Sequence, residues 1–166
     1  MSTTKHEPAD SQKSLTAALG RIPSGLFILT FRHGKQETAM LASWVQQCSF
    51  EPPQVVVAIN EKRFVLDWLT IGSPITVNIL AEGQKELMSH FGKGFEPGVP
   101  AFEGVEIERT GDFAPCLKAA HAVLECRVSA KYAAGDHVLI VARVDAGILQ
   151  HEGRPGVHVR RSGMHY

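Results

Sequence analysis

Residues 40–53 are the first stretch of the chain whose side chains suit ligand binding. They read Met-Leu-Ala-Ser-Trp-Val-Gln-Gln-Cys-Ser-Phe-Glu-Pro-Pro, and small and hydroxyl residues interrupt the apolar pattern. Such a strand brings backbone N–H and C=O groups close to a flat ligand and offers hydroxyls to the ligand's polar edges. An irregular strand with a β-bulge, without any ligand, accounts for the pattern equally well.

Two further segments carry cations that suit a phosphate. Residues 60–63, Asn-Glu-Lys-Arg, follow an apolar run and precede a helical pattern, so a phosphate there would contact Arg63 and the amides of the helix start. Residues 91–94, Phe-Gly-Lys-Gly, form a flexible loop with another cation. The competing interpretation is that these lysines and arginines are ordinary solvated surface.

The tight turn Gly135-Asp136-His137 places an imidazole at the start of a long β-type run. Histidine exchanges a proton near neutral pH and packs well against a nicotinamide ring. A structural histidine in a hairpin is the alternative. No other histidine from residue 121 onwards forms an i, i+4 pair, and Cys48, Cys116 and Cys126 form no C-x-x-C motif. The sequence therefore predicts no metal site and no nucleophilic triad.

Composition excludes several classes of protein. The 166 residues fit one domain, and 17 acidic residues balance 17 lysines and arginines. A net charge of zero gives no reason to expect nucleic acid or an anionic membrane as partner. No apolar run approaches the roughly 18 residues of a membrane helix, and the N-terminus lacks a signal core. We expect a soluble, cytoplasmic protein with reduced cysteines.

The elements that must position these segments are mainly β. A continuous apolar run at Val55–Ile59 predicts a strand buried on both faces, and turns are predicted at residues 33–35 and 134–136. Further strands are predicted at 25–31, 37–43, 75–80, 105–108, 120–132, 138–149 and 156–161. Short helices are predicted at 15–19, 64–69 and 82–91, and a loop at 92–99.

Many strands with hairpin-length connections favour an antiparallel sheet closed into a barrel over alternating βαβ units. The sequence argues against a Rossmann fold, because no G-x-G-x-x-G follows a strand, and no P-loop is present. We predict a disordered N-terminal segment at residues 1–13 and one domain at residues 14–166, with Ser14 capping its first helix.

Several segments together resemble the flavin reductase-like, FMN-binding split-barrel family. The similarity runs from about Leu19 to Tyr166, in the family's order. The variant Met-Leu-Ala-Ser-Trp-Val, with Leu41 and Trp44 where members usually carry Thr and Ser, resembles the reductase domain appended to some flavodiiron proteins. The matching segments are residues 21–25, 40–53, 77–80, 115–117, 124–127 and 135–137, and Tyr166.

The resemblance implies an antiparallel Greek-key split β-barrel with a few short helices, which forms a homodimer and binds FMN near the subunit interface. It places His137, as the catalytic residue, where nicotinamide stacks on the flavin, and Arg63 on the phosphate. The implied cofactor-binding residues are Met40, Leu41, Ala42, Ser43, Trp44, Cys48, Ser49, Asn60, Lys62, Arg63, Phe91 and Lys93.

The function implied is an NAD(P)H:flavin oxidoreductase, with FMN, or alternatively FAD, as flavin and NADH or NADPH as co-substrate. The flavin carries the redox chemistry, and the electrons pass on to an acceptor such as a redox partner protein. Two alternatives stay open. One is a non-catalytic FMN carrier or electron-transfer module that receives electrons from a partner protein. The other is a barrel that binds heme or no cofactor.

Overall fold

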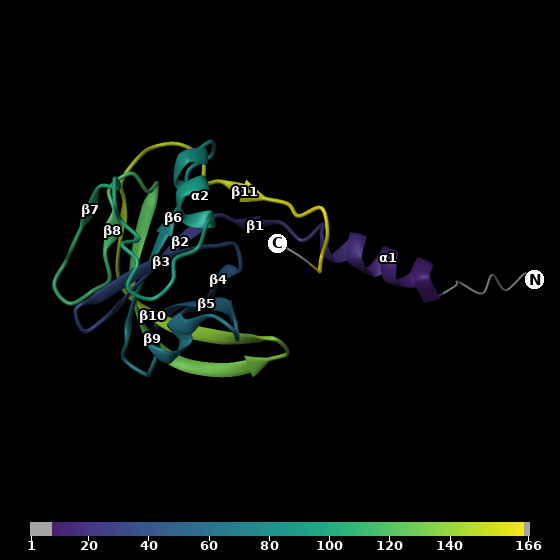
Figure 1. Ribbon diagram of the computed structural model, residues 1–166, viewed down its shortest axis with the longest axis horizontal. Coiled ribbons are helices and arrows are strands. Elements are labelled where there is room, and N and C mark those ends of the chain that lie inside the picture. The colour runs from purple at the N-terminus through teal and green to yellow at the C-terminus, as the bar shows by residue number, and fades with distance from the viewer. Residues whose placement is uncertain (1–7, 165–166) are drawn as a thin grey trace, which may run out of the picture. The chain divides into compact units, whose positions relative to one another are not determined.

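The computed structural model describes residues 8–164, and its main element is a seven-stranded antiparallel sheet (Figure 1). Hairpin turns join neighbouring strands at Gly34 and Gly135, where φ is +59° and +62°; only glycine adopts such values without strain. In spatial order the strands are β3 (Gln36–Ala42), β2 (Phe27–His33), β6 (Pro74–Ile79), β9 (Ala122–Ala134), β10 (His137–Leu149), β5 (Pro53–Asn60) and β4 (Val45–Phe50).

The sheet curls because its two edge strands are consecutive in the chain. β3 and β4 lie at opposite ends of the spatial order, and only Ser43 and Trp44 separate them. The backbone at this junction is fixed to β5, since the Ala58 N–H donates to the Trp44 carbonyl at 3.0 Å. A flat sheet cannot bring its edges together in two residues, so the strands must wrap around a common interior. The predicted antiparallel split barrel is confirmed.

The interior of the barrel holds the larger of two hydrophobic clusters. Val55, Val57 and Ile59 of β5 point into it, whereas Val56 and Ala58 on the other face are half-exposed. The prediction that this strand is buried on both faces is therefore wrong. β5 pairs antiparallel with both neighbours in a curled sheet, and such a strand has only one inward face.

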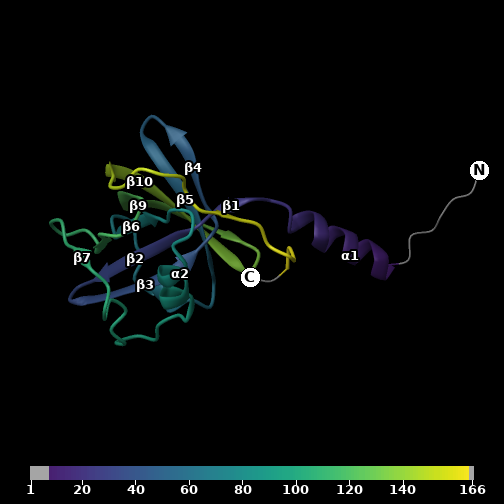
Figure 2. The same ribbon diagram turned by 90° about the horizontal axis from the view of Figure 1, so that it is seen from above.

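A second cluster lies on the other face of the sheet, beneath α2 (Lys85–Gly92) and the segment that carries β7 (Ile107–Glu108) and β8 (Cys116–Leu117). Figure 2 shows α2 beside β3. Buried polar side chains join this layer to the sheet. Asn78 of β6 donates to the Ile28 carbonyl at 3.0 Å and accepts from the Leu117 N–H at 2.8 Å. These bonds satisfy a fully buried amide and fix the layer's position on the sheet.

Among the described residues, 8–24 and 157–164 belong to a separate compact unit, distinct from residues 25–156. It contains α1 (Pro8–Leu19) and β11 (Val157–His158), which pairs with β1 (Ser24–Gly25). The predicted helix start at Leu15 is wrong, because proline and Asp10 both suit a first helical turn. Residues 8–13, expected to be disordered, are thus helical; residues 1–7, and Tyr166 of the resemblance, lie outside the described range. The division of the chain between residues 13 and 14 stays a prediction.

The other predicted elements differ from the observed helices and strands mainly in length. The helix predicted at 64–69 is a single 3₁₀ turn, η1 (Phe64–Asp67), and the helix predicted at 82–91 begins only at Lys85. The two long hairpin strands form as predicted, with β-bulges in their pairing. Across residues 8–164, no helix has the length and apolar character needed to cross a membrane.

Two of the three thiols lie inside the clusters and should make the protein sensitive to alkali. Burial raises the pKa of Cys126 and of Cys116 from an ordinary 9.0 to about 12. Unfolded thiols therefore ionise first as pH rises. The stability that the folded state gains from neutral buried thiols is fully present below pH 9.0, and it is lost as the pH rises toward the folded-state pKa of about 12. For fully buried Cys126, we expect the free energy of unfolding to fall by about 1.4 kcal/mol per pH unit in this window.

Urea denaturation at several pH values under reducing conditions measures this slope. Cys126→Ser should flatten it, because the titrating thiol is gone, whereas Cys48→Ser, at an exposed thiol, should leave it unchanged. An equal slope in the wild type and in Cys126→Ser would show that burial of this thiol does not control the response to alkali.

Candidate functional site

The centre of the candidate site is a pair of rings from distant parts of the chain. Trp44 lies at the β3–β4 junction and His137 begins β10; their ring centroids are 4.8 Å apart and the planes are tilted by 45°. The register of the sheet brings them together, because His137 pairs with Asn60 at the end of β5, and Ala58 of β5 bonds to Trp44. Three of the predicted site segments, those that contain Trp44, Asn60 and His137, therefore meet at one end of the β5–β10 pair.

The His137 ring is held firmly. It is only 8% exposed, and its Nδ1 lies 2.7 Å from Oδ1 of Asp136. The hydrogen bond from His137 keeps the pKa of the Asp136 carboxyl below its usual range, and nearby Lys62 adds to the effect. The Glu61 N–H donates to the Asp136 carbonyl at 3.0 Å, which ties the β9–β10 turn to the segment after β5.

The predicted cationic segments also come together. A Cβ on Gly94 would lie 3.7 Å from Nη1 of Arg63, so the glycine-rich loop runs beside this guanidinium. A Cβ on Gly92 would lie 3.5 Å from Cδ2 of Leu41, which places the same loop beside β3. Arg63 and Lys93 are exposed, and within residues 8–164 neither side chain has an ion pair or hydrogen bond to the protein. Both charges are thus available to an anion.

Lys131 fixes the turn that follows Arg63. Its Nζ donates to the carbonyl of Leu66 at 3.1 Å and to that of Leu69 at 2.8 Å. Leu66 belongs to η1 and Leu69 follows it directly, and Val65 and Leu69 are buried in the barrel interior. The arginine is therefore attached to an anchored segment rather than to a free loop.

The other predicted contacts on β3 are less accessible. Met40 and Ala42 pack against the barrel interior, Leu41 packs against the second cluster, and Ser43 is buried. Phe91 is 1% exposed within the second cluster, so only its backbone can face a ligand.

Cys48 and Ser49 lie at the other end of β4. Ser49 pairs with Gln54, at the opposite end of β5 from Asn60, and the two ends are about 20 Å apart at about 3.3 Å per residue. The register shifts between Gln47 and Ser49, so the strand has the irregularity expected of a bulge. Within one chain the structure therefore separates these two residues from the Trp44–His137 pair.

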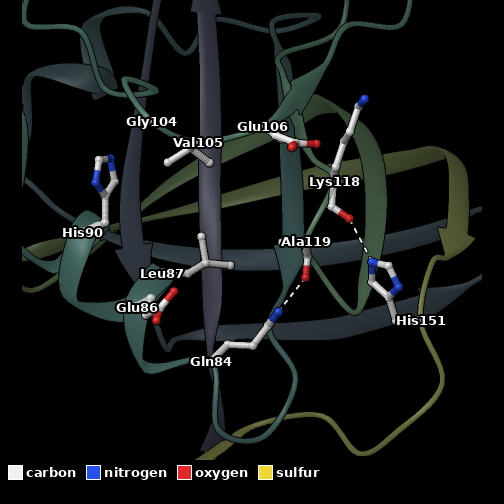
Figure 3. A pocket seen from close by; sticks show the side chains of 10 residues that line it. All are labelled: Gln84, Glu86, Leu87, His90, Gly104, Val105, Glu106, Lys118, Ala119 and His151. Atoms are coloured by element: carbon white, nitrogen blue, oxygen red, sulfur yellow. Dashed lines mark hydrogen bonds between the residues drawn. The ribbon is translucent and has the colours of Figure 1, made fainter.

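An open pocket of about 930 Å³ lies elsewhere, against α2 (Figure 3). His90, His151 and Gln84 point along its walls, but each already bonds to a backbone carbonyl, of Ala101, Lys118 and Ala119. Among the described residues, no three His, Cys, Asp or Glu side chains can hold a metal ion. No sequence motif indicated this pocket, because distant segments build it. Its lining residues are Gln84, Glu86, Leu87, His90, Gly104, Val105, Glu106, Lys118, Ala119 and His151, none of them a predicted site residue.

Comparison with known proteins identifies the family. Residues 19–165 match the model of the flavin reductase like domain. The chain belongs to this family. Diflavin flavoprotein A 1 of Synechocystis is 40% identical over 154 residues, which cover 92% of this chain but 27% of that protein. The chain therefore spans about a quarter of the length of this curated relative.

Solved structures share the fold. The NADH:FAD oxidoreductase SgcE6 of Streptomyces globisporus aligns with a TM-score of 0.81 at 24% identity, over 96% of this chain and 94% of that one. The styrene monooxygenase flavin reductase of Pseudomonas putida S12 aligns with a TM-score of 0.72 at 26% identity, over 86% and 90%. The Streptomyces enzyme was also solved with NAD and FAD fragments. The family therefore supplies a flavin and a nicotinamide nucleotide as the ligands to test against the site.

Proposed function

We propose that this chain binds FMN and uses NADH or NADPH to reduce it, and that the electrons then pass to an acceptor. The observation that carries the proposal is the Trp44–His137 ring pair together with the side chains of Arg63 and Lys93, which have no partner within residues 8–164. A flavin mononucleotide needs a flat apolar wall for its ring and a cation for its phosphate. This end of the β5–β10 pair offers both, in a family of flavin reductases.

The residues present fit this ligand. Trp44 is half-exposed at the β3–β4 junction, where a ring can lie against it and against the adjoining backbone. Arg63 would hold the phosphate, with Lys62 and Lys93 adding positive charge. FAD, which shares the isoalloxazine ring and the first phosphate, is the alternative. When bound, the flavin supplies the redox chemistry, since its ring accepts a hydride from a reduced nicotinamide.

The chain's own residues orient the reactants and exclude water. Trp44 walls one side of the site, and His137 is held at the start of β10, where a nicotinamide would approach. No nucleophile is required, because the bond changes occur between the two nucleotides. Leu41, half-buried beside Gly92, closes the side on which family members usually carry a hydroxyl.

Tryptophan fluorescence tests the placement of the flavin. We expect FMN to quench the emission of the protein, and Trp44→Phe to remove most of the quenching, because Trp44 lies in the site. Trp68 is the matched control: it stacks on His33 at a ring distance of 5.7 Å and is not a predicted site residue. Trp68→Phe should leave the quenching by FMN intact. Undiminished quenching in Trp44→Phe would place the flavin elsewhere.

A non-catalytic FMN carrier is the second candidate. This chain covers only 27% of the length of diflavin flavoprotein A 1. The rest of that protein is long enough to hold a separate electron source, which favours the carrier. Mixing the purified protein with FMN and then with NADH or NADPH separates the two functions. Oxidation of either nucleotide above the rate with free FMN supports the reductase, whereas FMN binding without oxidation of either supports the carrier. An absorption spectrum of heme would overturn both. The redox partner protein and the cytoplasmic location stay predictions.

We also propose that the working unit is a homodimer. Several large apolar side chains of the barrel are exposed, notably Phe50 at 88%, Ile148 at 63% and Leu149 at 60%. A second copy would cover such side chains and shield a flavin on the outer wall. We expect light scattering to give a dimer across a wide dilution series, and Phe50→Glu to shift it toward monomer. A wild-type monomer that binds FMN at full affinity would contradict the dimer.

A further inference from the structure

We infer that Asp136 is a positioning residue for reduction: it fixes the tautomer and orientation of the His137 ring. The inference rests on the proposed function and extends it to a residue that does not itself contact the flavin or the nicotinamide. Its basis is the 2.7 Å contact between Asp136 Oδ1 and His137 Nδ1.

The chemistry of the two groups decides where the proton lies in this contact. The carboxyl of Asp136 is ionised at neutral pH, and a carboxylate only accepts hydrogen bonds. The proton is therefore on Nδ1 of His137. In the neutral ring Nε2 then carries the lone pair, and protonation of the ring takes place at Nε2. The aspartate thus selects which nitrogen changes its protonation state.

The geometry of the turn makes this selection reliable. Asp136 follows Gly135, whose φ of +62° sets the turn, and its carbonyl accepts the Glu61 N–H. The side chain of Asp136 is 79% exposed, whereas that of His137 is 9% exposed and lies against Trp44. The carboxylate of Asp136 therefore reaches the buried ring from the solvent side. The turn at Gly135 and the hydrogen bond from the Glu61 N–H hold the backbone of Asp136 in place. Lys62 is the other charged group near this carboxylate.

A structural explanation exists as well, since a hydrogen bond between neighbours can simply stabilise a hairpin. The two explanations differ in what they predict for the ring. A turn stabiliser changes the melting temperature when removed but leaves the tautomer of His137 alone. A positioning residue changes the tautomer and the rate of reduction together.

Nitrogen NMR on protein labelled with ¹⁵N-histidine, without flavin, reads the tautomer directly. His137→Gln assigns the signal by removing it. We expect the wild type to carry the proton on Nδ1 when the ring is neutral, and Asp136→Ala to shift it toward Nε2. Asp136→Asn, whose amide oxygen still accepts a hydrogen bond, should shift it less. Glu82→Ala is the control, because it removes an exposed carboxylate that lies just before α2, outside the predicted site segments.

Reduction of FMN by NADH and NADPH is then measured on the same variants. We expect Asp136→Ala to slow reduction by roughly tenfold with the FMN dissociation constant unchanged, and Glu82→Ala to behave as the wild type. An unchanged tautomer in Asp136→Ala overturns the inference, as does a shifted tautomer with an unchanged rate. If the wild type reduces no flavin, the proposed function fails, and the inference about reduction fails with it; the NMR result still shows separately whether Asp136 sets the tautomer.

Discussion

Replacing His137 with alanine is expected to slow the reduction of FMN by NADH or NADPH by about a hundredfold while leaving FMN affinity nearly unchanged. The ring is buried, fixed by Asp136 and packed against Trp44, so it is pre-organised for one role. A positioned histidine that assists proton transfer typically contributes at least this factor. FMN affinity should change little, because Arg63 and the β3–β4 backbone provide the main proposed contacts.

The experiment separates rate from binding by titrating FMN first and then following flavin absorbance after adding the nicotinamide nucleotide. His33→Ala is a suitable control, since His33 is exposed at the β2–β3 turn. An unaltered rate in His137→Ala would reduce this residue to a structural role. A large loss of FMN affinity would instead show that the ring binds the flavin.

Replacing Arg63 with alanine is expected to weaken FMN binding by about tenfold to a hundredfold. A charge-assisted hydrogen bond to phosphate is worth about 1.5–3 kcal/mol, and no protein group pairs with this guanidinium within residues 8–164. Riboflavin provides a matched ligand because it has the same ring and no phosphate. Its affinity should hardly change in Arg63→Ala.

Two controls make the Arg63 result specific. Lys35→Ala removes an exposed cation from the β2–β3 turn, outside the predicted site segments, and should leave both ligands unaffected. Arg63→Lys keeps the charge but not the forked geometry, so it should restore part of the affinity. Equal loss of FMN and riboflavin in Arg63→Ala would mean that the arginine supports the fold and not the phosphate.

The parts of the fold predicted well from the sequence are those that depend on local chemistry. Gly34 and Gly135 mark the hairpin turns because only glycine adopts their positive φ without strain, and the strands beside them follow. The inward and outward faces of β5 depend instead on partners far away in the chain. A run of valines is compatible with burial on one face or on both, and the curl of the sheet decides between them.

In the candidate site too, residue types could be predicted from the sequence, whereas positions that depend on strand pairing could not. Trp44, Arg63 and His137 could be singled out from residue type and position, and the structure brings their segments to one end of the sheet. The resemblance places Cys48 and Ser49 at the same site. β4, however, runs away from the junction, so Ser49 pairs with Gln54, about 20 Å along β5 from Asn60, the partner of His137. Register could not be predicted from sequence spacing alone.

The central claim is that the chain itself accelerates electron transfer from a nicotinamide nucleotide to FMN. Anaerobic rapid mixing of the purified protein, carrying one equivalent of FMN, with excess NADH or NADPH tests it most directly. We predict that the absorbance of the oxidised flavin disappears much faster than with free FMN under the same conditions. Bleaching at the rate of free FMN with both nucleotides, despite proven FMN binding, would contradict the claim.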